Sequence, residues 1–90
     1  ITENIMLCFQ VDENKIMSAG QQAASFNEVT HCYQRPTFPD WPYNLFCMIH
    51  ASEQTHINNI IKKIASSIDC NTYLPIKSIK EFKKERVKYF

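Results

Sequence analysis

The chain has 90 residues, a length that suits one small domain, and its contents of 44% hydrophobic and 21% charged residues are ordinary for a globular fold. A formal net charge of +1 provides no general attraction to nucleic acid or to a membrane surface. No apolar run approaches the ~20 residues of a membrane span, and no signal-peptide pattern opens the chain.

The first expected strand covers residues 5–11, where apolar residues alternate with other side chains and make one face strongly apolar. Asp12 then suits the N-cap of a helix. The buried stripe of this helix has spacings of three and four and consists of Ile16, Ala19, Ala23 and Phe26. Gly20 lowers the stability of the helix but permits close approach to a sheet.

Two further strands are expected at residues 29–34 and 44–51. Ser52 then suits the N-cap of a second helix. The apolar stripe of that helix consists of Ile57, Ile60, Ile61 and Ile64. A turn at residues 69–71 leads to a fourth strand at residues 72–79, where Pro75 favours an edge position or a bulge.

The order of these elements is β-α-β-β-α-β, and residues 82–90 are basic and aromatic with no clear period. This order predicts an α+β fold, the ferredoxin-like βαββαβ sandwich, with two helices on one face of a four-stranded antiparallel sheet. We expect the other face to have no cover within the ninety residues. A partner subunit, a further segment or a ligand would then cover it.

The connector between the second and third strands is stiff and aromatic. It holds Pro36, Pro39 and Pro42, whereas a plain hairpin would use a short turn with Gly, Asn or Asp. Rigid loops carried by a sheet often form binding or catalytic sites. Its aromatic residues and one from the next strand could form a wall for a flat ligand, or a small satellite core that closes the loop, or both. These residues are Phe38, Trp41, Tyr43 and Phe46.

One histidine lies on each strand that flanks this connector, His31 on the first and His50 on the second. By strand parity, His31 shares a face with Val29 and Tyr33. If the hairpin register brings His31 near His50, both imidazoles lie on one face, with Tyr33 and Arg35 along the same line. Each histidine taken singly could instead be merely packed and hydrogen-bonded.

The four cysteines are scattered without the C-x-x-C spacing of zinc or cluster sites. They are Cys8, Cys32, Cys47 and Cys70. We expect free, reduced thiols in a cytoplasmic protein, with disulfides as the less favoured alternative. Six basic residues between residues 77 and 88, Lys84 and Arg86 among them, make the C-terminal end locally basic. This stretch could be a solvated surface or could attract a polyanion, of which nucleic acid is the less favoured kind.

Three segments have a distinctive sequence, namely Val29-Thr-His-Cys-Tyr-Gln-Arg-Pro36, Trp41-Pro-Tyr-Asn-Leu45 and Met48-Ile-His50. Together they strongly resemble the sirohaem decarboxylase family, which includes related subunits of d-type haem biosynthesis. The ending from Lys80 to Phe90 also resembles the C-terminus of that family.

The resemblance implies a ferredoxin-like domain of the Lrp/AsnC type, normally preceded by a helix-turn-helix domain. The start at Ile1 and not at Met suggests part of a longer polypeptide. Since these residues hold no helix-turn-helix domain, we expect residues 1–90 to be a single domain, the C-terminal half of a longer chain. The implied substrate is the iron tetrapyrrole sirohaem, whose two acetate carboxyl groups leave to give 12,18-didecarboxysirohaem in alternative haem or d-type haem biosynthesis. No separate cofactor is implied, and a homologous partner subunit would cover the open sheet face in a hetero- or homodimer.

The resemblance also suggests roles for the candidate residues. Decarboxylation of a pyrrole acetate needs a proton for the methyl group left behind, and histidine can supply one near neutral pH. We expect His31 and His50 to include the proton donor, and one of them could instead ligate the iron of the tetrapyrrole. The candidate substrate-binding residues are Tyr33, Arg35, Trp41, Tyr43, Lys84 and Arg86.

Two other functions fit the same fold. One is the effector-binding and oligomerisation domain of an Lrp/AsnC-type transcriptional regulator. Such regulators usually have a short connection with glycine at this hairpin, and the connector in this chain has none, which favours the enzyme. The other is a haem sensor that binds a tetrapyrrole without converting it, and the sequence does not separate this function from catalysis.

Overall fold

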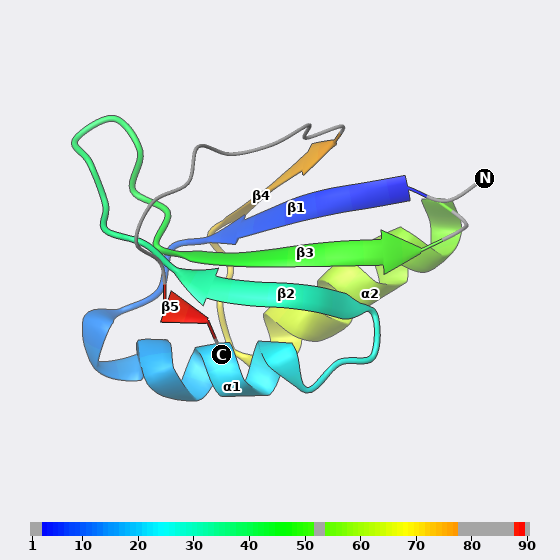
Figure 1. Ribbon diagram of the computed structural model, residues 1–90, viewed down its shortest axis with the longest axis horizontal. Helices are drawn as coiled ribbons and strands as arrows, with labels where there is room; N and C mark the ends of the chain where they lie inside the picture. Colours follow the sequence, from blue (N-terminus) through cyan, green and yellow to red (C-terminus); the bar gives the residue numbers. More distant parts are fainter. Residues whose placement is uncertain (1–2, 52–53, 78–87, 90) are drawn as a thin grey trace.

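The computed structural model describes residues 3–51, 54–77 and 88–89. In chain order its elements are β1 (Glu3–Phe9), the short 3₁₀ helix η1 (Glu13–Lys15), α1 (Ile16–Ala24), β2 (Val29–Gln34), β3 (Leu45–Ala51), α2 (Gln54–Ser67), β4 (Tyr73–Lys77) and β5 (Lys88–Tyr89). All the strand pairs are antiparallel, in the order β4-β1-β3-β2-β5 (Figure 1). The predicted ferredoxin-like βαββαβ sandwich is confirmed. The two-residue β5, beside β2, adds a strand that we did not expect.

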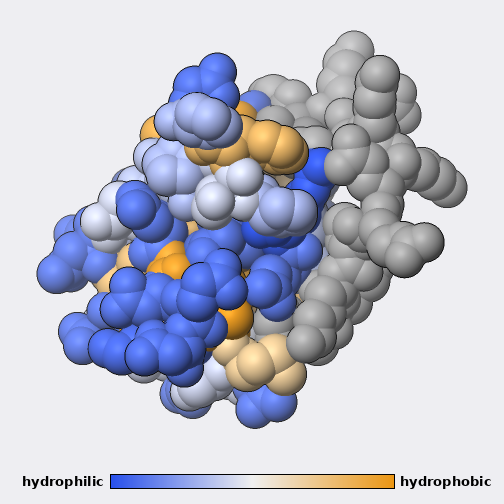
Figure 2. Space-filling model, turned by 90° about the vertical axis from the view of Figure 1, so that its left-hand side faces the viewer, coloured by the Kyte–Doolittle hydropathy of each residue, from blue (hydrophilic) through white to orange (hydrophobic). Residues whose placement is uncertain are grey.

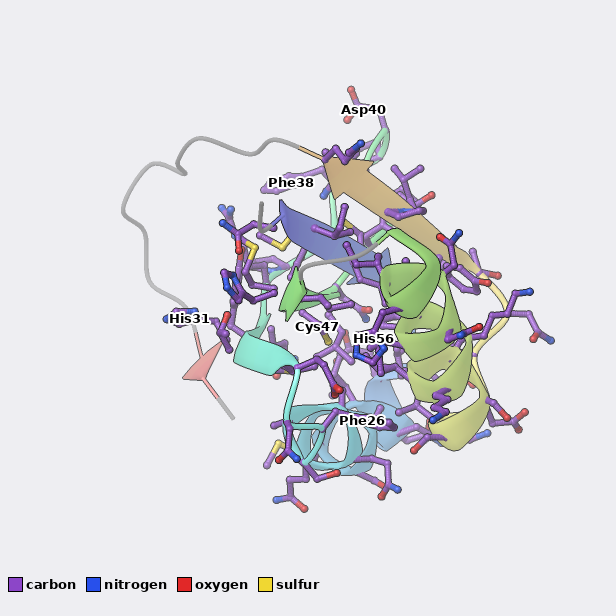
Figure 3. The ribbon with its side chains drawn as sticks, turned by 90° about the vertical axis from the view of Figure 1, so that its right-hand side faces the viewer. Phe26, His31, Phe38, Asp40, Cys47 and His56 are labelled. Atoms are coloured by element: carbon purple, nitrogen blue, oxygen red, sulfur yellow. The ribbon has the colours of Figure 1, made fainter. Side chains whose placement is uncertain are left out.

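The main core lies between the sheet and the two helices, which pack on the same face of it. Alternate residues of the central strands point into this core from β1 and β3, and the predicted stripes of both helices face them. The largest of these fully buried side chains are Phe9, Leu7, Leu45, Ile49, Ile57 and Ile64. In Figure 3, Cys47 lies on this side of the sheet, which is also the side of Phe26 and His56. None of the helices in the described part of the chain is long and apolar enough to cross a membrane.

The start of α1 differs from the expected N-cap. The side chain of Asp12 makes no capping hydrogen bond, and its backbone oxygen instead accepts a bond from the N–H of Lys15 at 2.9 Å, within the turn η1. Asp12 thus stands at the N-cap position of η1, the turn that leads into α1, but its side chain does not cap it. The close approach permitted by Gly20 is present, because the Sγ of Cys32 on β2 lies 3.6 Å from the Gly20 carbonyl oxygen.

A bulge in β2 changes the direction of the side chains at the start of this strand. Val29 pairs with Ile49, but His31 pairs with Met48, so one residue of β2, Thr30, has no counterpart on β3. Val29 consequently packs against the core under the helices, whereas His31 faces the opposite side of the sheet. The expectation that Val29 and His31 share a face is wrong, because strand parity holds only where the pairing is regular.

The second half of the fold agrees with the sequence where it is described. Asp69 has a φ of 55°, the left-handed conformation that ends a helix, and the N–H of Cys70 donates to the Ala65 oxygen at 3.0 Å. Pro75 lies on β4, the outer strand, which pairs only with β1 among the described strands. The edge position predicted from this proline is confirmed. Ser52, the expected N-cap of α2, lies outside the described residues.

Candidate functional site

The sheet face opposite the helices, which we call the open face, carries a second group of buried side chains. Met6, Cys8, Tyr33 and Phe46 are each at most 8% exposed. Partly buried residues pack against them, namely Trp41, Tyr43, Met48 and Ile76. The centre of the open face is thus covered, and the expectation that this face has no cover within the ninety residues is wrong there.

The register of three adjacent strands produces this group. Met6 and Cys8 on β1 face Met48 and Phe46 on β3, and Tyr33 on β2 faces Phe46 from the other side. The rings of Tyr33 and Phe46 stack with centroids 5.5 Å apart and an angle of 17° between their planes. The Tyr33 hydroxyl also approaches the Met6 sulfur at 3.8 Å.

The connector of residues 35–44, which we call the proline loop, projects beyond one end of the sheet (Figure 1). Two backbone hydrogen bonds of 3.0 and 2.9 Å join Phe38 and Trp41 and close the tip of this loop. The rings of Trp41 and Tyr43 meet edge to face, with centroids 5.0 Å apart. Viewed from this end of the molecule, hydrophobic residues reach the surface beside hydrophilic ones (Figure 2), and Phe38 is 54% exposed.

Asn44 holds the base of the proline loop. Its side chain is 4% exposed and bonds both backbone groups of Val11, since Oδ1 accepts from the N–H at 2.9 Å and Nδ2 donates to the oxygen at 2.7 Å. The backbone of Asn44 donates to the oxygen of Phe9 and accepts from the N–H of Arg35. The side-chain amide of Asn44 therefore ties the second end of the loop to the residue after β1 and its turn, while backbone bonds join that end to Phe9 and Arg35.

A pocket of about 200 Å³ opens on this face under the proline loop. Its lining is mostly apolar and consists of Met6, Cys8, Tyr33, Arg35, Pro36, Phe38, Trp41, Phe46 and Ile76. Three of the predicted substrate-binding residues, Tyr33, Arg35 and Trp41, are therefore brought together. Tyr43 packs against Trp41 but does not line the pocket. The satellite core is confirmed, because these aromatic rings pack together. Phe38, Trp41 and Phe46 also line the pocket, and the binding of a flat ligand against them stays a prediction.

The two candidate histidines share the open face. His31 lies opposite Met48, and His50 follows Met48 by two residues on β3, so both point to the side of Met48. Figure 3 shows His31 on the side of the sheet away from α2. Both side chains are exposed and neither lines the pocket.

Each of the two histidines has a polar neighbour at Nδ1. Nδ1 of His50 lies 2.8 Å from Oδ1 of Asn4, directly opposite on β1. Nδ1 of His31 lies 3.3 Å from Oγ1 of Thr30. Lys84 and Arg86, the remaining predicted binding residues, lie outside the described residues.

Sequence reasoning missed several contributors to this face. Met6 and Cys8 alternate with the strongly apolar residues of β1, and two apolar side chains at these alternate positions are typical of a strand that is buried on both faces. Ile76 and Asn4 join the face through the β1 register, and no local pattern reveals that pairing. The sequence pattern places Asn44 at the start of a strand, and its position between a proline-rich connector and an apolar segment is the signal that marks it.

The cysteines are structural in character. All four are buried free thiols, as predicted. Burial raises the pKa of Cys8 to about 12, so its thiol stays protonated and serves as apolar lining. Cys32 and Cys47 face each other across β2 and β3 with sulfurs 3.6 Å apart, and this hydrogen bond and burial raise the pKa of Cys47. Within the described ranges, no three His, Cys, Asp or Glu side chains gather as a metal site.

Comparison with known proteins agrees with the resemblance. The family model of the AsnC-like ligand binding domain matches residues 1–83. The siroheme decarboxylase beta subunit of Methanosarcina barkeri is 40% identical over 88 residues, which are 98% of this chain and 58% of that protein. The siroheme decarboxylase of Hydrogenobacter thermophilus is 39% identical over 87 residues, 97% of this chain and 26% of that protein. The chain thus spans little more than half the length of the first relative and about a quarter of the second.

Solved structures give the same result. The siroheme decarboxylase NirDL, crystallised in co-complex with an iron-uroporphyrin III analogue, matches with a TM-score of 0.80 and 38% identity, over 97% of this chain and 28% of that chain. A protein of Thermus thermophilus, TTHA0845, has a TM-score of 0.74 at 11% identity, over 91% of this chain and 99% of that one, and supports the fold alone. The chain belongs to the AsnC-like ligand-binding domain family, and the relatives it resembles within that family are sirohaem decarboxylases, as the sequence motifs predicted.

Proposed function

We propose that this chain is part of a sirohaem decarboxylase and that its open face binds the iron tetrapyrrole and acts on the acetate side chains. The proposal rests on one observation. Two exposed histidines lie on the same sheet face as an aromatic pocket that contains Arg35. The likeness to proteins named siroheme decarboxylase supports the choice of substrate.

The pocket is suited to one edge of the substrate. Its volume of about 200 Å³ lies below the ~300–1,000 Å³ of most small-molecule sites, so a whole tetrapyrrole does not fit inside it. We expect a ring edge to enter between Trp41 and Tyr33, where aromatic side chains can stack on it. The guanidinium of Arg35 can hold a substrate carboxylate in a bidentate pair. Lys84 and Arg86 keep their predicted role as attractors of the remaining carboxylates.

The reaction breaks the bond between the methylene carbon of an acetate and its carboxylate. Carbon dioxide leaves, and the electron pair of that bond passes into the conjugated ring. The methylene carbon then takes one proton and becomes a methyl group. His31 or His50, in the protonated form, supplies that proton. No other co-reactant is needed, which agrees with the expectation of no separate cofactor.

We further propose that a homologous subunit completes the site. The beta-subunit name of the Methanosarcina barkeri relative supports a two-subunit assembly. Apolar side chains remain exposed around the pocket, with Phe38 at 54% and Leu74 at 36%. Leu74 faces Cys8 across β1 and β4 and so lies on the open face. A partner placed over this face would bury these residues and enclose the part of the tetrapyrrole that the pocket does not hold.

The test is an anaerobic absorbance titration of the protein with sirohaem, followed by mass analysis of the recovered tetrapyrrole. Saturable binding with loss of carboxyl groups is the expected result, and Arg35→Gln should weaken binding by about tenfold or more because a charge-assisted pair is lost. Lys62→Gln, an exposed change on α2 and far from the open face, is the matched control. Binding without mass loss, even with a partner subunit present, would favour a sensing domain. No binding in any combination would favour the effector domain of a regulator.

A further inference from the structure

A short polar contact on the open face joins Asn4 and His50. The two residues are directly opposed on β1 and β3, and Oδ1 of Asn4 lies 2.8 Å from Nδ1 of His50. The backbone N–H of His50 also donates to the oxygen of Glu28 at 3.0 Å. The side chain of Asn4 thus holds His50 from the β1 side, and the backbone of Glu28 holds it from the β2 side.

This contact has a chemical consequence for the imidazole. An amide oxygen can only accept a hydrogen bond, so the nitrogen that faces it must carry the proton. Nδ1 of His50 therefore remains protonated in both the neutral and the charged ring. Nε2 becomes the nitrogen that gains and loses a proton. The partner at Nδ1 defines which nitrogen of a histidine is available for chemistry.

The fold itself does not explain Asn4. Asparagine is depleted from strands, and an exposed side chain at this position adds little to the packing of β1. An exposed hydrogen bond between side chains also contributes little to stability, because water competes for both groups. The contact at His31 is weaker, since Thr30 is its sequence neighbour and the distance is 3.3 Å. The Thr30 hydroxyl donates to the Met48 carbonyl oxygen at 3.3 Å, so it too accepts at Nδ1. Of these two contacts, the one at His50 is the shorter and the one that joins two strands.

We propose that Asn4 is a positioning residue for decarboxylation, holding the Nδ1–H of His50 so that Nε2 delivers the proton to the methylene carbon. This inference rests on the proposed function, and it assigns the proton transfer to His50 in preference to His31. Asn4 acts through His50 and does not itself touch the reacting atoms.

The test compares three variants of the full protein, with its partner subunit where activity requires one. Asn4→Leu keeps the approximate size and removes the acceptor, Asn4→Asp restores an acceptor, and Asn27→Leu changes an exposed asparagine in the loop before β2. The first readout is ¹⁵N NMR of histidine-labelled protein, which reports the protonated nitrogen. In the unchanged protein we expect His50 to be protonated at Nδ1. In Asn4→Leu we expect the population to move toward Nε2–H.

The second readout is the kinetics of carboxyl loss. Asn4→Leu should lower kcat about tenfold with little change in KM, because substrate binding is untouched while the proton donor is misoriented. Asn4→Asp should recover most of the rate, and Asn27→Leu should match the unchanged protein. An active protein whose His50 tautomer and kcat are the same in Asn4→Leu would overturn the role of Asn4 and leave the proposed function intact. Absence of carboxyl loss from the unchanged protein would instead overturn the proposed function, and the catalytic purpose of Asn4 with it.

Discussion

The anchoring of the proline loop by Asn44 gives the sharpest prediction about the fold. Asn44→Ala removes two hydrogen bonds to the backbone of Val11, of 2.9 and 2.7 Å, from a site that is 4% exposed. The backbone bond from Arg35 to residue 44 survives, because it involves no side-chain atom. The change therefore tests the amide of Asn44 alone.

The expected loss of stability follows from these bonds. Each contributes roughly 1 kcal/mol net, and a buried backbone group left without a partner costs about 1–3 kcal/mol. Val11 is 9% exposed, so water can reach it in part and the lower end of this range applies. The free energy of unfolding should fall by about 2–4 kcal/mol, which corresponds to a fall of at least about 1 M in the urea midpoint.

Urea unfolding followed by the fluorescence of Trp41, the only tryptophan, is a suitable assay. We expect Trp41 in Asn44→Ala to emit at longer wavelength before unfolding begins, because the loop that carries it is less tightly held. Asn71→Ala, at an exposed position before β4, is the control and should stay within about 0.5 kcal/mol. If Asn44→Ala unfolds at the midpoint of the control, Val11 does not depend on Asn44 and the anchoring argument is wrong.

Three further predictions concern the open face and the thiols. Burial raises the pKa of Cys8 from 9.0 to about 12, so the thiol loses its proton at lower pH in the unfolded chain than in the folded one. The free energy of unfolding should therefore fall as the pH rises from 9 to 12, by about 1 kcal/mol for this thiol at pH 10. In Cys8→Ala, denaturation should show a smaller fall in the free energy of unfolding over the same pH range. The four buried thiols should react with a thiol reagent only as fast as the protein opens, and a fast-reacting thiol in the folded protein would contradict their burial. Tyr33→Phe should change the free energy of unfolding by less than about 1 kcal/mol, since the ring stacking remains. Phe46→Ala should lower it by about 3–5 kcal/mol in the same urea assay. Equal effects of the two changes would refute the view that the stacked rings, and not the Tyr33 hydroxyl, stabilise this group.

The sequence predicted the elements whose patterns are local. Four isoleucines at helical spacing identify α2 because a 3.6-residue period is independent of the rest of the fold. The three prolines between two strand patterns indicate the rigid loop in the same way, because this signal too lies within one short stretch of sequence. Pro75 identified an edge strand because it lacks a donor for a second neighbour.

The features that the sequence did not predict depend on pairing. The bulge beside His31 is a property of β2 and β3 together, and it reverses the face of Val29. The two-residue β5 is too short to show a period and is defined by its neighbour β2. Asn4 and His50 are 46 residues apart in sequence, and only the register of β1 and β3 brings them into contact. The candidate residues were thus identifiable by type, while their partners required the structure.

The most direct measurement of the central claim is single-turnover decarboxylation of bound sirohaem by His31→Ala and His50→Ala, with mass analysis of the product. A general acid contributes about 10²–10⁴-fold to the rate. We expect His50→Ala to bind sirohaem with an unchanged absorbance titration and to remove its carboxyl groups at least ~100-fold more slowly than the unchanged protein, with a smaller effect in His31→Ala. Normal rates of carboxyl loss in both variants would contradict the assignment of the chemistry to the histidines of the open face.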